Sequence, residues 1–328
     1  RLDAMQSSLK ICINSFYGYL GYARGLFNDY ERADEVTKTG REILRAVIDK
    51  IVLHGGIVVE VDTDGVYFVP PDNVIGEEAE LELMQHVSKS LPSGILLAVD
   101  GRYLKILSYK KKNYALLDYD QKVVIRGSSL ISRNMERFVR NYVQQCIGCL
   151  LTENIESLHN LYVNLYRDVS AHRVDVRDFA RTEQLRDSLE QYGLDVASGK
   201  RNKSAVYEVA IASYRNYRPG DRVAYYITGN DPNVKGFENS KLAEAWDPNF
   251  PDENAPYYLK RLDESSKKFE VFFAPQDFRR IFTVDDLFEF SANEIKILTK
   301  ETREEEEPIE EESPEPSARE FKIWLAEE

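Results

Sequence analysis

The sequence predicts an α+β protein, and three observations support this. Apolar residues recur with helical spacing over Leu2–Tyr22 and Ala33–His54. Two runs rich in β-branched residues, Ile57–Val61 and Val66–Pro70, flank the turn sequence Thr-Asp-Gly. Further short strand-like runs follow a third helical pattern, and the chain beyond Leu130 is mostly helical. Strands that follow helices within one compact stretch are typical of this fold class.

The first helix places three polar side chains on one face. Lys10, Asn14 and Tyr17 are spaced four and three residues apart, so successive turns present them together. A lysine offers a flexible point charge suited to phosphate, and a tyrosine offers a flat ring and a hydroxyl. Taken alone, such a row is more often a solvated helix face than a binding site.

The acidic turn holds two carboxylates one residue apart. Side chains alternate along a strand, so Asp62 and Asp64 are expected to point the same way. Two like charges this close repel, and a divalent cation relieves the repulsion. Magnesium fits, because it binds carboxylates and keeps positions for water and phosphate. An ordinary hairpin tip is an equal alternative, and Asp-x-Asp-Gly also resembles the nucleophile motif of haloacid-dehalogenase-like phosphatases.

The remaining elements are expected in a simple order. A helix over Glu77–Leu91 ends at Pro92-Ser93-Gly94. Four strands are expected after it: Ile95–Val99, Tyr103–Tyr109, Tyr114–Asp118 and Val123–Arg126. The later part is expected to contain one strand, Arg222–Thr228, and six helical segments: Ser132–Thr152, Ile155–Arg167, Gln184–Tyr192, Lys203–Tyr214, Tyr257–Ser266 and Pro275–Phe282.

Charge is distributed unevenly along the 328 residues. The net charge of −13 falls largely on residues 301–328, which carry −9, whereas Arg102–Arg140 carries +7. A local basic face is what a phosphate backbone responds to. Arg303–Ser317 is acidic and nearly devoid of apolar residues, which predicts disorder. The apolar cluster near its end, within residues 319–326, is expected to dock on a partner or to pack back on the chain.

The cysteine content and the hydropathy of the sequence indicate the cellular compartment in which the protein is expected. Three cysteines predict no disulfide framework and a reducing compartment, so we expect a cytoplasmic or nucleoid-associated protein. Cys146 and Cys149 lie in a helical run and are expected to be core residues. No apolar run approaches the ~20 residues of a membrane span. The chain opens on Arg1 inside a helical pattern, which suggests a fragment, a processed product or half of a split protein.

Three motifs in order give the sequence a family resemblance. Lys10–Gly18 reads K-x-x-x-N-S-x-Y-G, Asp62-Thr63-Asp64 follows some 45 residues later, and Lys111–Tyr114 reads K-K-x-Y. These resemble motif B, motif C and the primer–template motif of family B DNA polymerases. Ile125–Gly127 resembles the short segment before that family's thumb, and Val206–Ala212 with Pro219–Val223 resembles the thumb's helix and strand. The resemblance implies a fingers helix at 1–22, a palm with an antiparallel sheet at 23–130, a mostly helical thumb at 131–300 and a tail at 301–328.

The resemblance also implies roles for individual residues. Asp64 would be the principal ligand of two Mg²⁺ ions, with Asp62 at the edge of the site. The nucleotide-binding residues would be Lys10, Asn14, Tyr17 and Gly18, which meet the incoming deoxynucleoside triphosphate and the nascent base pair. The residues along the primer–template duplex would be Lys111, Lys112, Tyr114 and Arg126. The reaction would be nucleotidyl transfer to a primer 3′-hydroxyl by a two-metal mechanism.

The sequence differs from the family pattern in ways that reduce the activity expected of this chain alone. Glu60 and Gly65 stand where the family usually has Tyr and Ser. Neither a motif A strand nor an exonuclease domain occurs in the sequence. Because the site needs the motif A carboxylate, we expect the chain alone to be inactive. It would require a missing segment or a partner polypeptide that carries motif A and the exonuclease. The alternatives are a non-catalytic duplex-binding subunit with a decayed site and, remotely, the phosphatase.

Overall fold

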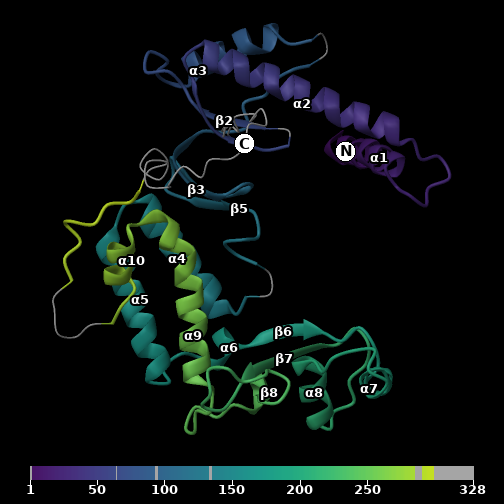
Figure 1. Cartoon of the computed structure of the whole chain (residues 1–328), viewed down its shortest axis with the longest axis vertical. Helices are drawn as coiled ribbons and strands as arrows, with labels where there is room; N and C mark the ends of the chain where they lie inside the picture. The colour runs from purple at the N-terminus through teal and green to yellow at the C-terminus, as the bar shows by residue number, and fades with distance from the viewer. Residues whose placement is uncertain (1, 64, 93–94, 133–134, 285–289, 299–328) are drawn as a thin grey trace, which may run out of the picture. The chain divides into compact units, whose positions relative to one another are not determined.

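The computed structural model describes residues 2–63, 65–92, 95–132, 135–284 and 290–298. Asp64 and the acidic tail therefore lie outside the described residues. The described chain forms two compact units that meet in sequence between Tyr103 and Leu104 (Figure 1). Each unit is described by itself below, so the assignment of fingers, palm and thumb along the chain stays a prediction.

The first unit contains three helices and a hairpin. The helices are α1 (Leu2–Leu20), α2 (Tyr30–Leu53) and α3 (Glu77–Lys89), and the strands are β1 (Ile57–Val61) and β2 (Val66–Val69). Asp29 caps α2 by accepting a hydrogen bond from the amide of Arg32 at 3.0 Å. The strands pair antiparallel, with a bulge between Val58 and Glu60. Five buried apolar side chains make the core: Val47, Ile51, Val66, Leu83 and Val87.

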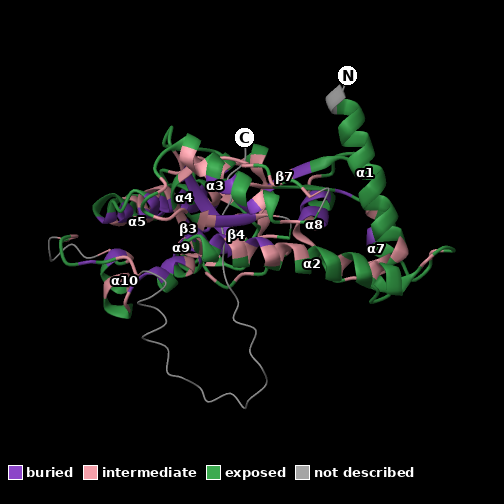
Figure 2. Cartoon of the chain, turned by 90° about the horizontal axis from the view of Figure 1, so that it is seen from above, coloured by how far each residue is buried: buried purple, intermediate pink, exposed green. Residues whose placement is uncertain are grey.

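This first unit leaves much of its apolar surface uncovered. Of the 26 large hydrophobic side chains that are exposed among the described residues, 19 belong to residues 1–103. Helix α1 is exposed along almost its whole length (Figure 2). Phe16 is 77% exposed and Ile13 is 67% exposed, both on this one helix. So many exposed apolar side chains on one unit are typical of a region that further polypeptide covers.

The second unit begins with an antiparallel sheet and continues into a helical bundle. The sheet has the order β3–β4–β5, formed by Tyr103–Lys110, Asn113–Asp118 and Val123–Arg126. The bundle is made of α4 (Arg137–Leu151), α5 (Ile155–Ser170), α9 (Ala255–Ser266), the 3₁₀ turn η2 (Lys267–Phe272) and α10 (Pro275–Ile281). The amphipathic helices α4 and α5 bury their apolar faces against one another and against α9.

A second small sheet packs at the far end of this bundle (Figure 1). Its strands are β6 (Arg181–Gln184), β7 (Arg222–Ile227) and β8 (Ser240–Leu242), all antiparallel. The short helices around it are α6 (Val176–Phe179), α7 (Leu189–Ala197), α8 (Ala205–Ala212) and the 3₁₀ turn η1 (Ala243–Ala245). Tyr258 of α9 joins bundle and sheet: its hydroxyl accepts the amide of Ile227 at 2.8 Å, and its ring stacks on Phe179 with centroids 4.0 Å apart.

The cysteines behave as the sequence predicts. Cys146 and Cys149 lie in α4, where Cys146 is buried and Cys149 is partly buried. Burial raises the pKa of the Cys146 thiol well above its ordinary value, since a thiolate would lose its hydration there. Both are therefore core residues. Within the described part of the chain, no helix is both long and apolar enough to cross a bilayer.

Two expected elements are wrong. Residues 95–99 form no strand, although their composition favours one, because they pair with no neighbouring strand in the described structure. The expected helix Gln184–Tyr192 is instead the end of strand β6 followed by α7, which begins at Leu189 after the cap Ser188. The polar sequence Arg-Thr-Glu-Gln forms a strand because β7 supplies its hydrogen-bonding partner.

Candidate functional site

The acidic turn lies where β1 passes into β2. The amide of Asp62 donates to the carbonyl of Gly65 at 3.0 Å, which closes the turn. One carboxylate oxygen of Asp62 accepts the amide of Thr63 at 2.7 Å, which fixes the orientation of this partly exposed side chain. Glu60, by contrast, is 1% exposed. An antiparallel hairpin also lacks the strand–loop–helix arrangement that the phosphatase interpretation requires.

The chemistry of the turn suits magnesium, but the described residues do not complete a metal site. Asp62 offers the oxygen donor that Mg²⁺ prefers. Among the residues that the structure describes, no three His, Cys, Asp or Glu side chains gather closely enough to hold a metal ion. The predicted principal ligand, Asp64, lies outside the described residues. The role of the two aspartates therefore stays a prediction.

Helix α1 displays the predicted nucleotide-binding row. Lys10 and Asn14 are exposed, and Tyr17 is 43% exposed at the next turn. Lys10 and Asn14 border a hollow of about 550 Å³ whose other walls are mostly apolar: Met5, Gln6, Leu9 and Ile13. A Cβ atom on Gly18 would meet no described atom within 4 Å, so the helix is open on that side. The row is thus available to a ligand.

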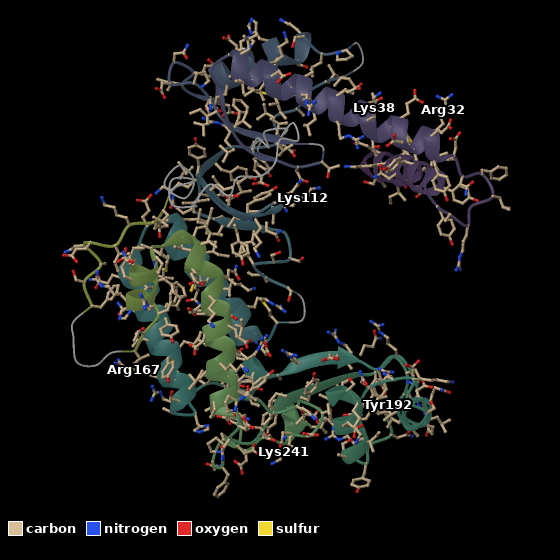
Figure 3. The ribbon with its side chains drawn as sticks, viewed as in Figure 1. Arg32, Lys38, Lys112, Arg167, Tyr192 and Lys241 are labelled. Carbon is tan, nitrogen blue, oxygen red and sulfur yellow. The ribbon has the colours of Figure 1, made fainter. Side chains whose placement is uncertain are left out.

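The Lys-Lys-Asn-Tyr segment forms the tight turn between β3 and β4. Lys111 and Lys112 occupy the turn, and Lys112 adopts a left-handed backbone with φ of 59° (Figure 3). Tyr114 is only 2% exposed, whereas Arg126, its partner in the β4–β5 register, is exposed. The role of the two lysines and of Arg126 along a duplex stays a prediction, and buried Tyr114 belongs to the strand that follows the turn.

Asn113 connects this turn to the segment that follows β5. Its side-chain amide donates to the carbonyl of Lys111 at 2.8 Å, and its oxygen accepts the amide of Ser129 at 2.8 Å. Gly127 lies against it with φ of +83°, where a Cβ atom would stand 2.3 Å from both Asn113 Oδ1 and the Lys112 carbonyl. In the sequence, Asn113 is only the variable position of the K-K-x-Y motif. The structure makes it the residue that joins two of the predicted DNA-binding segments.

A groove lined by arginines lies between the start of α4 and the β6–β7 sheet, and sequence reasoning missed it. Its volume is about 1190 Å³. Seven arginines line it: Arg137, Arg140, Arg177, Arg181, Arg186, Arg201 and Arg222. The predicted basic stretch Arg102–Arg140 contributes only two of them, Arg137 and Arg140. Arg102 instead binds Glu80 at 2.6 Å in the first unit. The other five groove arginines are separated in the sequence by acidic residues, so no local charge pattern predicts the groove.

Two stacked tyrosines shape one end of the arginine groove. The rings of Tyr192 and Tyr207 stack with centroids 4.3 Å apart, and the Arg201 guanidinium lies 4.5 Å from the centre of the Tyr207 ring. The Tyr207 hydroxyl accepts hydrogen bonds from the backbone amides of Arg186 and Asp187, both at 3.0 Å.

Two arginines of the groove have no acidic partner within the part of the chain that the structure describes. Among the described residues, Arg186 and Arg222 form no ion pair, so these two cations remain available to an anionic ligand.

A smaller hollow extends the arginine groove toward the Lys111–Lys112 turn. It has a volume of about 250 Å³ and is lined by Gly127 and Gln144 among others. Ile131 and Arg140 line both spaces, so the groove and this hollow adjoin. The second unit therefore presents cationic side chains from the β3–β4 turn to β7. Such a track matches the backbone of an extended polyanion.

Comparison with known proteins identifies the family. The sequence matches the pattern described as DNA polymerase family B over residues 1–268. The chain belongs to DNA polymerase family B. Its relatives include the DNA polymerase of Pyrococcus glycovorans, 28% identical over 266 residues, and that of Thermococcus gorgonarius, 26% identical over 270 residues. Each comparison covers 79% of this chain and 33% of the relative.

The fold agrees with membership of the polymerase family. The family B DNA polymerase of the hyperthermophilic archaeon Pyrobaculum calidifontis matches 82% of this chain with a TM-score of 0.61 and 23% sequence identity. The matched region is 34% of that polymerase. This chain thus spans about a third of the length of these relatives, and its mixed α+β fold is that of the corresponding part.

Proposed function

We propose that the chain is the C-terminal part of a DNA-directed DNA polymerase, which transfers a nucleotide from a deoxynucleoside triphosphate to a primer 3′-hydroxyl. The observation that carries this proposal is the exposed row Lys10, Asn14 and Tyr17 on α1, in a chain that belongs to DNA polymerase family B. The spacing of the row matches triphosphate, sugar and base in turn. The Asp62 turn lies in the same unit.

Each residue has a physical role in this proposal. The Lys10 ammonium neutralises the triphosphate, Asn14 hydrogen-bonds phosphate or sugar, and the Tyr17 ring meets the nascent base pair. Asp62 and Asp64, with a motif A carboxylate, would hold Mg²⁺. When bound, Mg²⁺ supplies electrostatic stabilisation of the transferred phosphoryl group. A side chain that senses the shape of the base pair in the minor groove accepts every sequence, because A·T and T·A present the same acceptors there.

In this proposal, the complete enzyme needs a motif A carboxylate and an exonuclease from a segment that these 328 residues do not include, either in the same polypeptide or in a partner chain. The uncovered apolar surface of residues 1–103 supports this part of the proposal, because α1 alone exposes Met5, Leu9 and Ile13 beside Lys10. Apolar surface of this extent favours burial in a complex. The covering polypeptide would bring the missing carboxylate to the acidic turn.

Primer extension by mixtures of the two polypeptides tests the proposal directly. The purified chain alone is expected to extend no primer, and addition of the motif A polypeptide is expected to start magnesium-dependent synthesis. The motif A polypeptide by itself serves as the control. Appreciable synthesis by this chain alone, or failure of the mixture to bind and synthesise, would contradict the proposal.

The arginine groove of the second unit is proposed to hold the phosphate backbone of the primer–template duplex. We expect Arg186→Gln combined with Arg222→Gln to weaken duplex binding about tenfold or more, because two unpaired cations are lost. The slope of log affinity against log salt should become shallower by about 0.9 for each lost phosphate contact. Fluorescence anisotropy with a labelled primer–template duplex measures both quantities.

Arg279→Gln is the matched control for the groove variant. Arg279 is an exposed arginine of α10 that does not line the groove. Two successive Arg→Gln changes on α10, at Arg279 and Arg280, reproduce the full change in net charge. Equal losses of affinity in the groove and control variants would show that only overall charge matters and would overturn the assignment of the groove.

A further inference from the structure

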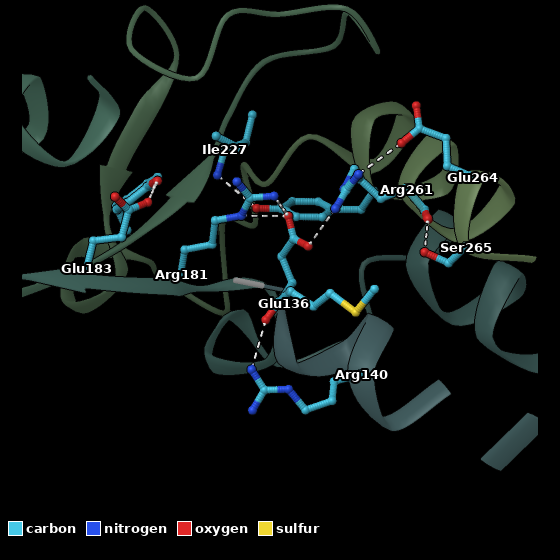
Figure 4. Close-up of polar contacts among 11 residues, drawn as sticks. Glu136, Arg140, Arg181, Glu183, Ile227, Arg261, Glu264 and Ser265 are labelled. Atoms are coloured by element: carbon cyan, nitrogen blue, oxygen red, sulfur yellow. Dashed lines mark hydrogen bonds and ion pairs between the residues drawn. The ribbon is translucent and has the colours of Figure 1, made fainter. Parts of the chain in front are cut away.

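A buried carboxylate lies beside the arginine groove and joins three separate segments. Glu136 immediately precedes α4 and is 1% exposed. Its partners are Arg181, the first residue of β6, and Arg261 in α9 (Figure 4). The helical bundle and the β6–β7 sheet thus share one ionic cluster. Glu136 itself is not among the side chains that line the groove.

Both oxygens of Glu136 are engaged by different elements. Arg181 donates from Nε at 2.8 Å and from Nη2 at 2.5 Å, both to Oε1. Arg261 donates from Nη2 to Oε2 at 3.3 Å. The second arm of Arg261 donates to Glu264 at 2.9 Å (Figure 4). The two hydrogen bonds from Arg181 fix the plane of its guanidinium group, which a single contact would leave free to rotate.

The charges of this cluster persist despite burial. Burial disfavours the ionised form of Arg181, but the negative charge and hydrogen bond of Glu136 outweigh it, so the pKa of Arg181 is raised. The pKa of Arg261 is raised by the same balance. A buried carboxylate is tolerated when cations and hydrogen bonds compensate its lost hydration. Such clusters add little net stability, and where they have a role it is to select one geometry.

The cluster stands where two walls of the groove meet. Met135 and Arg137, on either side of Glu136 in sequence, line the groove from the α4 side. Arg181 and the residues after it, Thr182 to Gln184, line it from the β6 side. Arg140 reinforces the first wall, because its Nη2 donates to the Met135 carbonyl at 3.2 Å. The bond between Glu136 and Arg181 therefore sets the distance and angle between the walls.

We infer that Glu136 is a positioning residue of the groove: it holds Arg181, and with it the β6 wall, in the orientation that meets the DNA phosphates. This inference rests on the proposed function of the groove in duplex binding. It makes the affinity of the groove depend on a carboxylate that does not touch the ligand. Negative charge at this position then strengthens the binding of a polyanion.

Glu136→Gln tests the inference, with Glu264→Gln as the matched control. The glutamine keeps the shape of the side chain and removes the charge that fixes Arg181. We expect about tenfold weaker binding of a primer–template duplex and a salt slope shallower by about one phosphate contact. Glu264 also binds Arg261, but its side chain is 44% exposed, and its variant is expected to bind normally. Each variant loses one negative charge. If only the net charge of the chain mattered, both variants would therefore bind the duplex more tightly than the wild type.

Measuring folding and duplex affinity for the same variant separates a positioning role of Glu136 from a role in stabilising the fold. Thermal unfolding followed by circular dichroism gives the folded fraction of each variant. A folded Glu136→Gln chain with the wild-type affinity and salt slope would overturn the inference. If this variant does not fold, Glu136→Asp becomes the test, because the shorter side chain keeps the charge but withdraws the carboxylate from Arg181; Glu264→Asp is its control. Weaker binding by Glu136→Asp than by its control supports the inference, and equal binding overturns it.

The groove variant distinguishes this inference from the proposal on which it rests. If Arg186→Gln with Arg222→Gln weakens binding while Glu136→Gln does not, the groove binds DNA and only the positioning role fails. If neither variant changes the affinity, the groove is not the duplex-binding surface and the proposed function of the groove fails with it.

Discussion

Replacing Asp64 by Asn is expected to reduce primer extension by the reconstituted enzyme about a thousandfold. A metal site contributes several kcal/mol to transition-state stabilisation in phosphoryl transfer, and each ~1.4 kcal/mol is a factor of ten in rate. Asparagine keeps the size of the side chain but removes the charge that Mg²⁺ requires. Single-turnover extension of a labelled primer, with this chain and the motif A polypeptide at saturating concentration, measures the effect.

Asp72→Asn is the matched control for this experiment, because Asp72 is an exposed aspartate of the same unit. Its variant is expected to synthesise normally. Duplex affinity should be unchanged in both variants, since the groove belongs to the other unit. Normal synthesis by Asp64→Asn would instead favour the non-catalytic, duplex-binding alternative for this chain.

Gly127→Ala is expected to destabilise the second unit by about 2–5 kcal/mol. A left-handed backbone costs a residue with a Cβ atom about 1–2 kcal/mol, and overpacking costs about 1–3 kcal/mol. Both penalties apply, because φ is +83° and the new methyl group would lie 2.3 Å from the Lys112 carbonyl oxygen. Urea unfolding of the full chain, monitored by circular dichroism, gives the change in free energy.

Gly199→Ala separates the two penalties. Gly199 also has a positive φ, of +72°, but a Cβ atom there would meet nothing within 4 Å. Its variant should therefore cost only the conformational part, about 1–2 kcal/mol. Adding Asn113→Ala to Gly127→Ala should not restore stability, because the Lys112 carbonyl stays in place. Equal costs for the two glycine variants would contradict the close packing of Gly127 against the β3–β4 turn.

Elements with strong local signals were predictable from the sequence. The third helix was expected at Glu77–Leu91 and is found at Glu77–Lys89, because its apolar spacing and the following Pro92 are both local. Strand β5 has the predicted bounds, Val123–Arg126. Family membership was also predictable, since three ordered motifs are more specific than any one of them. It is confirmed by the match over residues 1–268.

Features that depend on distant partners were not predictable. Strand β6 has no apolar alternation and exists because Gln184 pairs with Arg222, far along the chain. The bridging role of Asn113 depends on Ser129, and the arginine groove gathers residues from 131 to 222. Glu136 is one more acidic residue in the sequence and becomes distinctive only when Arg181 and Arg261 enclose it. Sequence patterns report local periodicity, whereas these features arise from tertiary packing.

The uncovered apolar surface of residues 1–103 has a consequence for producing these 328 residues by themselves. A chain without the segment that covers this surface would present Phe16, Ile13 and their neighbours to chaperones, proteases and other copies of itself. Molecules in which this surface stays uncovered are then removed or aggregate. Production together with a segment that covers the surface is therefore expected to raise the yield of folded chain.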